Sequence, residues 1–276
     1  MKLAWVTDIH LDCVDNLQTA LNSLNAGLAG CDGLILSGDI STGSSVTYHL
    51  RDLEEVVQKP IYFVLGNHDY YFSDILDVRH RVVETTRYMS FSKYLGAIPY
   101  HRLSNSTVII GSDGWYDAFN GDAIGSDMIM NDWLKIADFK PAIKNSLMGK
   151  TINKSIIMQV AREICKASVN HIIKSIKIVA DDSEHVIVVT HVPPFAESYT
   201  DDKYKNILPQ NVIPWYTSKM MGEMLKTAAK TYQQTRFTVL SGHTHSPFEG
   251  DILHNLHAKV GKSQYGSPQI AGYINI

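Results

Sequence analysis

The sequence opens with Leu3-Ala4-Trp5-Val6-Thr7-Asp8-Ile9-His10, a short apolar run that ends in a carboxylate and an imidazole two residues apart. The apolar part of this stretch is typical of a buried strand. Residues i and i+2 of an extended chain point to the same side, so we expect Asp8 and His10 to bind one ion together. The motif is common in isolation and gains weight only because similar groups follow later in the chain.

Four later apolar runs also predict strands, and each ends in a short polar group. The predicted strands are Gly33–Ser37, Ile61–Leu65, Val186–Val189 and Phe237–Leu240. The groups that follow them are Gly38-Asp39, Gly66-Asn67-His68-Asp69, Thr190-His191 and Gly242-His243-Thr244-His245. Each group alone has a simpler reading as a turn, a helix cap or a surface histidine pair. Their order and their shared position at strand ends favour one common site.

In the segments between these predicted strands, the apolar residues have helical spacing. This spacing predicts helices over Leu17–Leu28, Val46–Val57, Ser73–Thr86, Ile156–Ile176 and Ser218–Lys230, with Ser73 as the cap of the third, and further strands at Thr107–Gly111, His257–Val260 and Gln269–Ile274. Alternating strands and helices predict an α/β fold with parallel strands and crossover helices. Open sheets of this kind bind ligands at the carboxyl ends of their strands. The glycines before Asp39, Asn67 and His243 fit sharp turns or close backbone approach.

The composition is that of an ordinary soluble protein: 276 residues, 45% hydrophobic, 19% charged and a net charge of −3. This balance gives no bulk positive charge for binding nucleic acid or an anionic membrane. Apolar runs stay well short of the ~20 residues that span a bilayer. Cys13, Cys31 and Cys165 have no metal-type spacing, and no signal-peptide pattern is visible. We expect a cytoplasmic protein built as one domain over residues 1–276; the oligomeric state stays open.

Seven side chains at the strand ends form a mixed oxygen and nitrogen ligand set: Asp8, His10, Asp39, Asn67, His191, His243 and His245. Such a set without thiolate suits manganese, iron, zinc or cobalt rather than calcium. Seven ligands are too many for one catalytic ion. They suit two ions that share one carboxylate.

The ordered pattern D-x-H, G-D, G-N-H-D, H and G-H-x-H resembles the calcineurin-like metallophosphoesterase family, over about residues 4 to 245. The resemblance implies a four-layer αββα sandwich of two mixed β-sheets with helices outside. It implies two divalent or trivalent transition-metal ions, most readily manganese, iron or zinc. One ion would be held by Asp8, His10, Asp39 and His245, and the other by Asp39, Asn67, His191 and His243, with Asp39 bridging.

The implied chemistry is hydrolysis of a phosphoester by a hydroxide that bridges the two ions. Metal binding lowers the pKa of water towards ~7, which supplies a nucleophile at neutral pH. The resemblance leaves His68 free of the metals and next to the substrate, where it would protonate the leaving oxygen. We expect Asp69 to fix the tautomer of His68, so both residues are catalytic candidates.

Departures from particular branches of the family narrow the substrate. The protein-phosphatase branch carries an arginine soon after its Gly-Asp and a glutamate after its Gly-Asn-His, whereas this chain continues Gly38–Gly43 without arginine and has Asp69. We therefore expect a small phosphodiester or nucleotide-like substrate. A phosphomonoesterase or protein phosphatase is the first alternative, and a scaffold that has the fold without catalysis is the second.

The stretch from about residue 115 to 150 breaks the strand–helix rhythm, so we interpret it as an insertion or lid. Trp115 and Tyr116 follow a predicted strand directly. They either rim the site, where a nucleotide base could stack on them, or pack beneath the insertion. Trp215 and Tyr216 leave the same two readings open.

Overall fold

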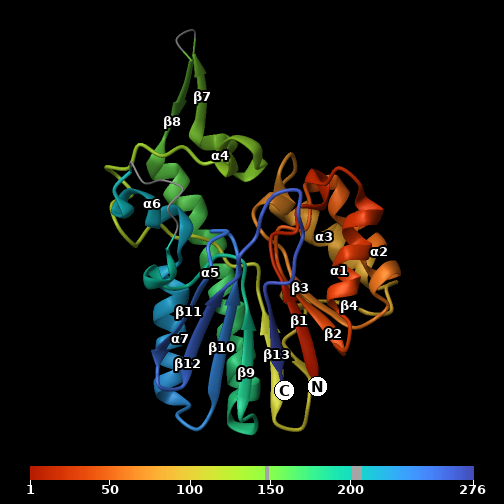
Figure 1. Cartoon of the computed structure of the whole chain (residues 1–276). Coiled ribbons are helices and arrows are strands. Elements are labelled where there is room, and N and C mark those ends of the chain that lie inside the picture. Colours follow the sequence, from red (N-terminus) through yellow and green to blue (C-terminus); the bar gives the residue numbers. More distant parts are fainter. Residues whose placement is uncertain (147–148, 201–206) are drawn as a thin grey trace.

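The computed structural model describes residues 1–146, 149–200 and 207–276. The N-terminal strand lies in the first of two large sheets (Figure 1). The strand order of this sheet is β13-β1-β2-β3-β4. The strands are β1 (Lys2–Val6), β2 (Gly33–Ser37), β3 (Ile61–Val64), β4 (Ser92–Tyr94) and β13 (Gly272–Asn275). Neighbours from β1 to β4 are parallel, and β13 pairs antiparallel with β1. The sheet is therefore mixed, with a parallel body.

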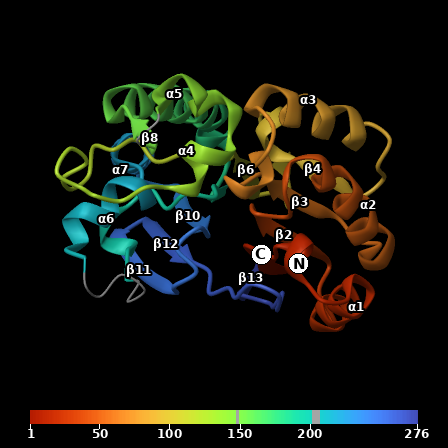
Figure 2. The same ribbon diagram turned by 90° about the horizontal axis from the view of Figure 1, so that it is seen from above.

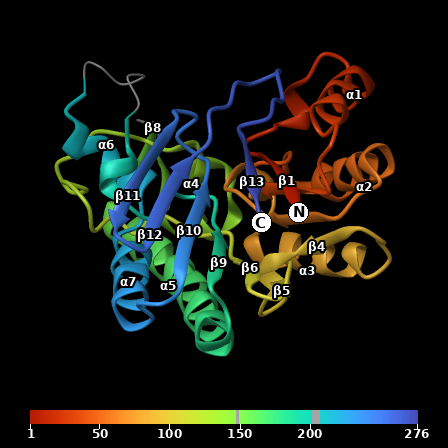
Figure 3. The ribbon, with the colours of Figure 1, turned by 60° about the horizontal axis from the view of Figure 1, so that its bottom comes forward.

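The second sheet has the order β11-β12-β10-β9-β6-β5, and Figure 3 shows β11, β12, β10 and β9 side by side. Its strands are β5 (His101–Arg102), β6 (Thr107–Gly111), β9 (His185–Val189), β10 (Arg236–Ser241), β11 (Phe248–Leu253) and β12 (Leu256–Val260). The four inner strands are parallel, and the two outermost strands run antiparallel to their neighbours.

Helices cover the outer face of each sheet (Figures 1 and 2). The first sheet is covered by α1 (Leu17–Gly27), α2 (Val46–Val57) and α3 (Ile75–Thr86), and the second by α5 (Lys154–Val179) and α7 (Lys219–Thr231). The architecture is an α/β fold of two mixed sheets flanked by helices, as the sequence predicted. Short 3-10 turns lie at Leu11–Cys13, Gly43–Ser45, His68–Tyr70, Leu95–Ala97, Ala137–Ala142, Ala180–Asp182 and Ala196–Ser198.

Alternation along each inner strand builds two kinds of core. Leu3 and Trp5 of β1 point between the sheets, whereas Ala4 and Val6 point to the helices. The inter-sheet core also contains Ile35, Tyr62, Val64, Leu95, Ile109, Ile187, Val189, Leu240 and Ile274. Both faces of these strands are buried, which explains their nearly continuous apolar runs. Each fully buried large side chain contributes about 1.5–3 kcal/mol, so the strand ends rest on a rigid base.

Local details differ from the sequence expectation at a few positions. The cap of α3 is Asp74, which accepts a hydrogen bond from Asp77 N, and not Ser73, whose hydroxyl donates to the Asp77 side chain. The sequence did not predict strands β4 and β5. They have three and two residues, which are too few to show an alternation of apolar and polar side chains. The sequence also did not predict strand β11, because this edge strand contains the non-apolar residues Glu249, Gly250 and Asp251.

The expected insertion lies between β6 and α5 and contains α4 (Asn131–Lys135) and the hairpin β7 (Ile143–Ser146)–β8 (Gly149–Ile152). The hairpin projects from the top of the molecule in Figure 1. Residues 147–148 of the expected insertion lie outside the described residues. The short helix α6 (Pro209–Tyr216) lies next to this region. Among the described residues, no helix is both long and apolar enough to cross a bilayer.

Candidate metal centre

The loops after the strands of both sheets meet at one edge of the sandwich. Backbone hydrogen bonds join the first two loops, from Asp8 N to Gly38 O and from His10 N to Asp39 O, both at 3.0 Å. In the second sheet Gly242 N donates to His191 O at 2.9 Å. These bonds fix the loops against one another and bring together all seven side chains that the sequence singled out.

One group of donor atoms surrounds the first strand end. The Nε2 atom of His245 lies 3.4 Å from Asp8 Oδ1 and 3.4 Å from His10 Nε2. His10 Nε2 is in turn 3.7 Å from Asp39 Oδ2. This group comprises the same four residues as the first ligand set implied by the resemblance.

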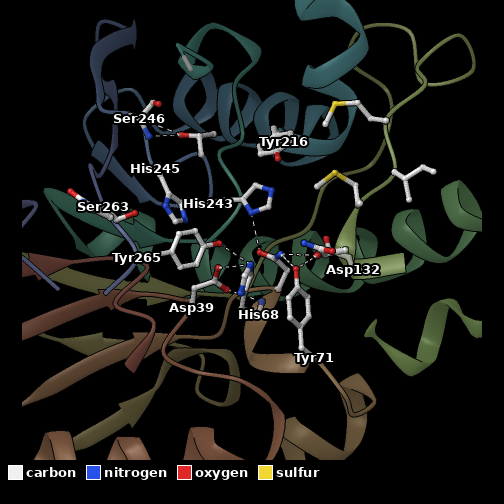
Figure 4. A pocket seen from close by; sticks show the side chains of 17 residues that line it. Asp39, His68, Tyr71, Asp132, Tyr216, His243, His245, Ser246, Ser263 and Tyr265 are labelled. Carbon is white, nitrogen blue, oxygen red and sulfur yellow. Dashed lines mark hydrogen bonds and ion pairs between the residues drawn. The ribbon is translucent and has the colours of Figure 1, made fainter. Parts of the chain in front are cut away.

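A second group lies on the other side of Asp39. The Oδ1 atom of Asn67 is 2.9 Å from His191 Nε2 and 3.0 Å from His243 Nδ1. His191 Nε2 is 3.4 Å from Asp39 Oδ1. Asp39 therefore turns one carboxylate oxygen to each group. Figure 4 shows Asp39 beside His68 at the cavity.

The spacing of these atoms fits metal ions. Ligand atoms about 2.1 Å from one ion are about 3.0 Å apart in octahedral and about 3.4 Å apart in tetrahedral geometry. Clusters able to hold an ion include Asp8 with His10 and His245, and Asp8 with Asp39 and His191. A third such cluster joins His10 and Asp39 to His68. The donor chemistry and the distances both fit a dinuclear site.

Electrostatics also favour cations here. Burial raises the pKa of Asp39 well above its ordinary value, and the neighbouring Asp8 charge raises it further. Burial would raise the pKa of Asp8 too, but the hydrogen bond from His245 and the nearby histidine charges outweigh it, so that pKa lies well below its ordinary value. Burial lowers the pKa of His10 and of His243 to about 3. Their lone pairs are thus free to bind metal at neutral pH.

The backbone at these strand ends is strained. Positive φ angles occur at several of the candidate ligands: Asp8 (48°), His10 (40°), Asp39 (52°), His243 (69°) and His245 (62°). Such a conformation costs a non-glycine residue of order 1–3 kcal/mol and is often clustered at functional sites. The convergence of Asp8 and His10 therefore arises from a left-handed turn, which corrects the extended-strand explanation.

Two glycines let the backbone press against the ligand side chains. A Cβ added at Gly66 would lie 2.8 Å from Asp39 Cγ, and one at Gly242 would lie 3.1 Å from Asp8 Cγ, with a carboxylate oxygen closer still in each case. Any larger residue would displace a carboxylate. Close approach, rather than a special φ angle, is the reason for glycine at these two positions.

The two catalytic candidates occupy different environments. His68 Nε2 lies 3.3 Å from the Tyr265 hydroxyl and 4.0 Å from Asp39 Oδ2. Asp69 is fully buried and accepts hydrogen bonds from three backbone amides, those of Gly66, Ile40 and Ser41. The Asp69 side chain thus links the loop after β3 to the loop after β2. This finding corrects the expectation that Asp69 fixes the His68 tautomer. Burial raises the pKa of Asp69 to about 8.

A cavity of about 560 Å³ opens over both donor groups. Its wall includes several residues that the sequence did not single out, among them Tyr71, Asp132 and Tyr265. The Tyr265 ring stacks on His10 with ring centroids 4.2 Å apart. Tyr71 closely follows the Gly-Asn-His-Asp motif and could have been found there. Asp132 lies in the aperiodic insertion and Tyr265 beyond the last motif, so no sequence signal marked them.

The structure decides between the two readings of the aromatic pairs Trp115–Tyr116 and Trp215–Tyr216. Trp115 and Tyr116 are almost fully buried, do not line this cavity, and pack with Phe139 and Trp133, which supports the packing interpretation. Trp215 is likewise buried. Segment 115–150 nevertheless forms part of the cavity wall, through residues that include Met128, Ile129 and Met130, and Tyr216 also lines the cavity.

Among the solved structures that share this fold are three proteins whose descriptions differ. They are phosphopantetheinyl hydrolase from Mycobacterium tuberculosis (15% identity, 96% of this chain and 90% of that chain, TM-score 0.68), a dimetal phosphatase from Danio rerio (10%, 95% and 87%, 0.56), and GAP50, described as the anchor in the inner membrane complex of Plasmodium (12%, 99% and 79%, 0.51). At these identities the likeness shows the fold alone.

None of the curated proteins compared with the chain matches it. A family model described as calcineurin-like phosphoesterase matches residues 1–247. This family acts on phosphoesters, and the buried aspartate and histidine clusters at the strand ends provide the candidate metal site. By that match, which covers most of its length, this protein belongs to the calcineurin-like phosphoesterase family.

Proposed function

We propose that this protein is a dinuclear-metal phosphoesterase that hydrolyses a phosphodiester in a small, nucleotide-like molecule. The observation that carries the proposal is Asp39, with one carboxylate oxygen 3.7 Å from His10 Nε2 and the other 3.4 Å from His191 Nε2. A buried carboxylate shared in this way is suited to bridging two cations. Manganese, iron and zinc all accept this ligand set.

The remaining ligands divide between two ions. Asp8, His10 and His245 would hold one, and Asn67, His191 and His243 the other. Two bound ions would supply Lewis-acid activation of water and positive charge to neutralise the phosphate. The two carboxylates contribute two negative charges, so the loaded site keeps a positive surplus that attracts an anionic phosphoryl group.

His68 is the residue that we propose to protonate the leaving oxygen, and three observations support this role. Its side chain is 19% exposed and lines the cavity, and its Nε2 atom is 4.0 Å from Asp39 Oδ2. Burial, with the nearby His10 and His191, lowers the pKa of His68 to about 2 in the free protein. An anionic phosphoryl group beside Nε2 would oppose this shift and favour the protonated ring. The hydroxyl of Tyr265 holds the orientation of the ring.

The cavity wall supports a substrate with a flat or apolar part. Tyr71, Tyr216 and Tyr265 offer aromatic faces, and Met128 and Met130 offer adaptable thioethers. A nucleotide base would stack on such rings. The phosphopantetheinyl hydrolase among the fold relatives makes a phosphopantetheine diester a further compound to assay.

The test combines metal analysis with two chromogenic esters. We expect about two metals per chain, turnover of bis-p-nitrophenyl phosphate, and loss of turnover after chelation. Turnover of p-nitrophenyl phosphate alone would instead identify a phosphomonoesterase. A purified protein that binds no metal and cleaves neither ester would favour a scaffold, the class of role that the description of GAP50 names for that protein.

A further inference from the structure

A carboxylate of the insertion reaches one of the proposed metal ligands. Asp132 of α4 is fully buried, and its Oδ1 atom accepts hydrogen bonds from Asn67 Nδ2 at 2.8 Å and from the Tyr71 hydroxyl at 2.9 Å. Figure 4 shows Asp132 and Tyr71 together at one side of the cavity. The insertion thus contacts the loop after β3 at the residue that faces both His191 and His243.

The contact decides which end of the Asn67 amide points at the histidines. An amide group has a donor end, Nδ2, and an acceptor end, Oδ1, and the two can exchange by rotation. A carboxylate oxygen accepts only, so Asp132 holds the donor end. The acceptor end is left 2.9 Å from His191 Nε2 and 3.0 Å from His243 Nδ1. In the reversed orientation an NH₂ group, which cannot bind a cation, would face the site.

We propose that Asp132 is a positioning residue that keeps the Asn67 carbonyl oxygen directed at the second metal site. The inference rests on the proposed function, because it takes Asn67 as a ligand. Groups that orient ligands in this way typically change metal affinity by about 10–100-fold when removed. The first site takes its donors from other loops, so the effect falls on one site only.

Titration calorimetry of the metal-stripped full-length protein with manganese chloride tests the proposal. In Asp132→Ala we expect one site to weaken about 10–100-fold while the other keeps its affinity. Asp132→Asn should stay close to the wild type, because an amide oxygen also accepts from Asn67 Nδ2. Rescue by the asparagine variant is a result that a merely structural role would not produce.

Asp138→Ala is the matched control. Asp138 lies in the same insertion and accepts a hydrogen bond from Ile75 N at 3.0 Å, but it does not reach the donor groups. This variant removes an insertion carboxylate that also contacts the sandwich, and we expect it to keep both manganese affinities.

Three results would overturn the proposal: wild-type affinity at both sites in Asp132→Ala, equal weakening of both sites, or an asparagine variant as weak as the alanine variant. If Asp132→Ala does not fold, Asp132→Ser gives the same comparison, because its short hydroxyl stops before Asn67. Binding is measured without substrate. A wild type that binds two manganese ions but cleaves no phosphoester would therefore remove the proposed activity and leave this inference standing.

Discussion

The substitution Gly66→Ala tests whether the crowded backbone at the strand ends controls the site. The added Cβ would lie 2.5 Å from Asp39 N and 2.8 Å from Asp39 Cγ, where ordinary contacts are 3.4–4 Å. The Asp39 carboxylate or the Gly66 loop must therefore move by about 1 Å. A displacement of that size at a catalytic site costs about 100-fold in rate. Overpacking adds about 1–3 kcal/mol of destabilisation.

The assay measures three quantities on the purified variant: kcat/KM for bis-p-nitrophenyl phosphate, manganese affinity by calorimetry, and the free energy of unfolding in urea. Gly272→Ala is the control, because its added Cβ would meet Trp5 at an ordinary 3.5 Å. We expect Gly66→Ala to lose at least about 100-fold in kcat/KM with weaker metal binding, and Gly272→Ala to stay near the wild type. A Gly66→Ala protein with unchanged turnover and metal affinity would refute the steric reasoning.

Three further predictions concern single side chains. His68→Asn should lower kcat by about 100-fold or more with both metals retained; loss of metal on elemental analysis would make His68 a ligand instead. Asp39→Ala should empty both sites, and two metals per chain in that variant would contradict the bridging role. Burial, with Arg236 nearby, lowers the pKa of His185 to about 4 from an ordinary 6.5. The unfolded chain then binds the extra proton between these values, so the free energy of unfolding of the metal-free protein should fall as pH drops from 6.5 to 4. In urea titrations His185→Gln should show a smaller fall, and an equal fall would show that His185 contributes nothing.

The sequence predicted the fold and the gathering of donor residues for a common reason. Strands buried on both faces are largely apolar, so a charged residue such as Asp39, two positions after the end of β2, is conspicuous. Parallel strands place their carboxyl ends at one edge of a sheet. The two sheets of the sandwich meet at this edge, so His245 Nε2 lies only 3.4 Å from Asp8 Oδ1 although the two residues follow strands of different sheets. The pattern of apolar runs and the parallel arrangement of the strands were together sufficient to predict the fold and the gathering of the donor residues.

Features that depend on tertiary contacts could not be predicted. Asp69 stands next to His68 in sequence, yet its carboxylate turns towards the backbone of Ile40 and Ser41. Asp132 reaches Asn67 from 65 residues away, out of a stretch without periodicity. Two residues that are neighbours in sequence can lie in one loop while their side chains point in different directions. A contact made by a residue of an irregular segment leaves no periodic pattern in the sequence.

The chain crosses from one sheet to the other in the connection between β12 and β13 (Figure 3). Tyr265 belongs to this crossing, and its ring stacks on that of His10. The family match ends at residue 247, before the crossing begins. The segment that covers the first donor group therefore lies outside the residues that the family model matches. A change in the length or residues of this crossing would therefore alter two things at once, the entrance of the cavity and the hydroxyl group that contacts His68, while the donor atoms at the strand ends kept their places.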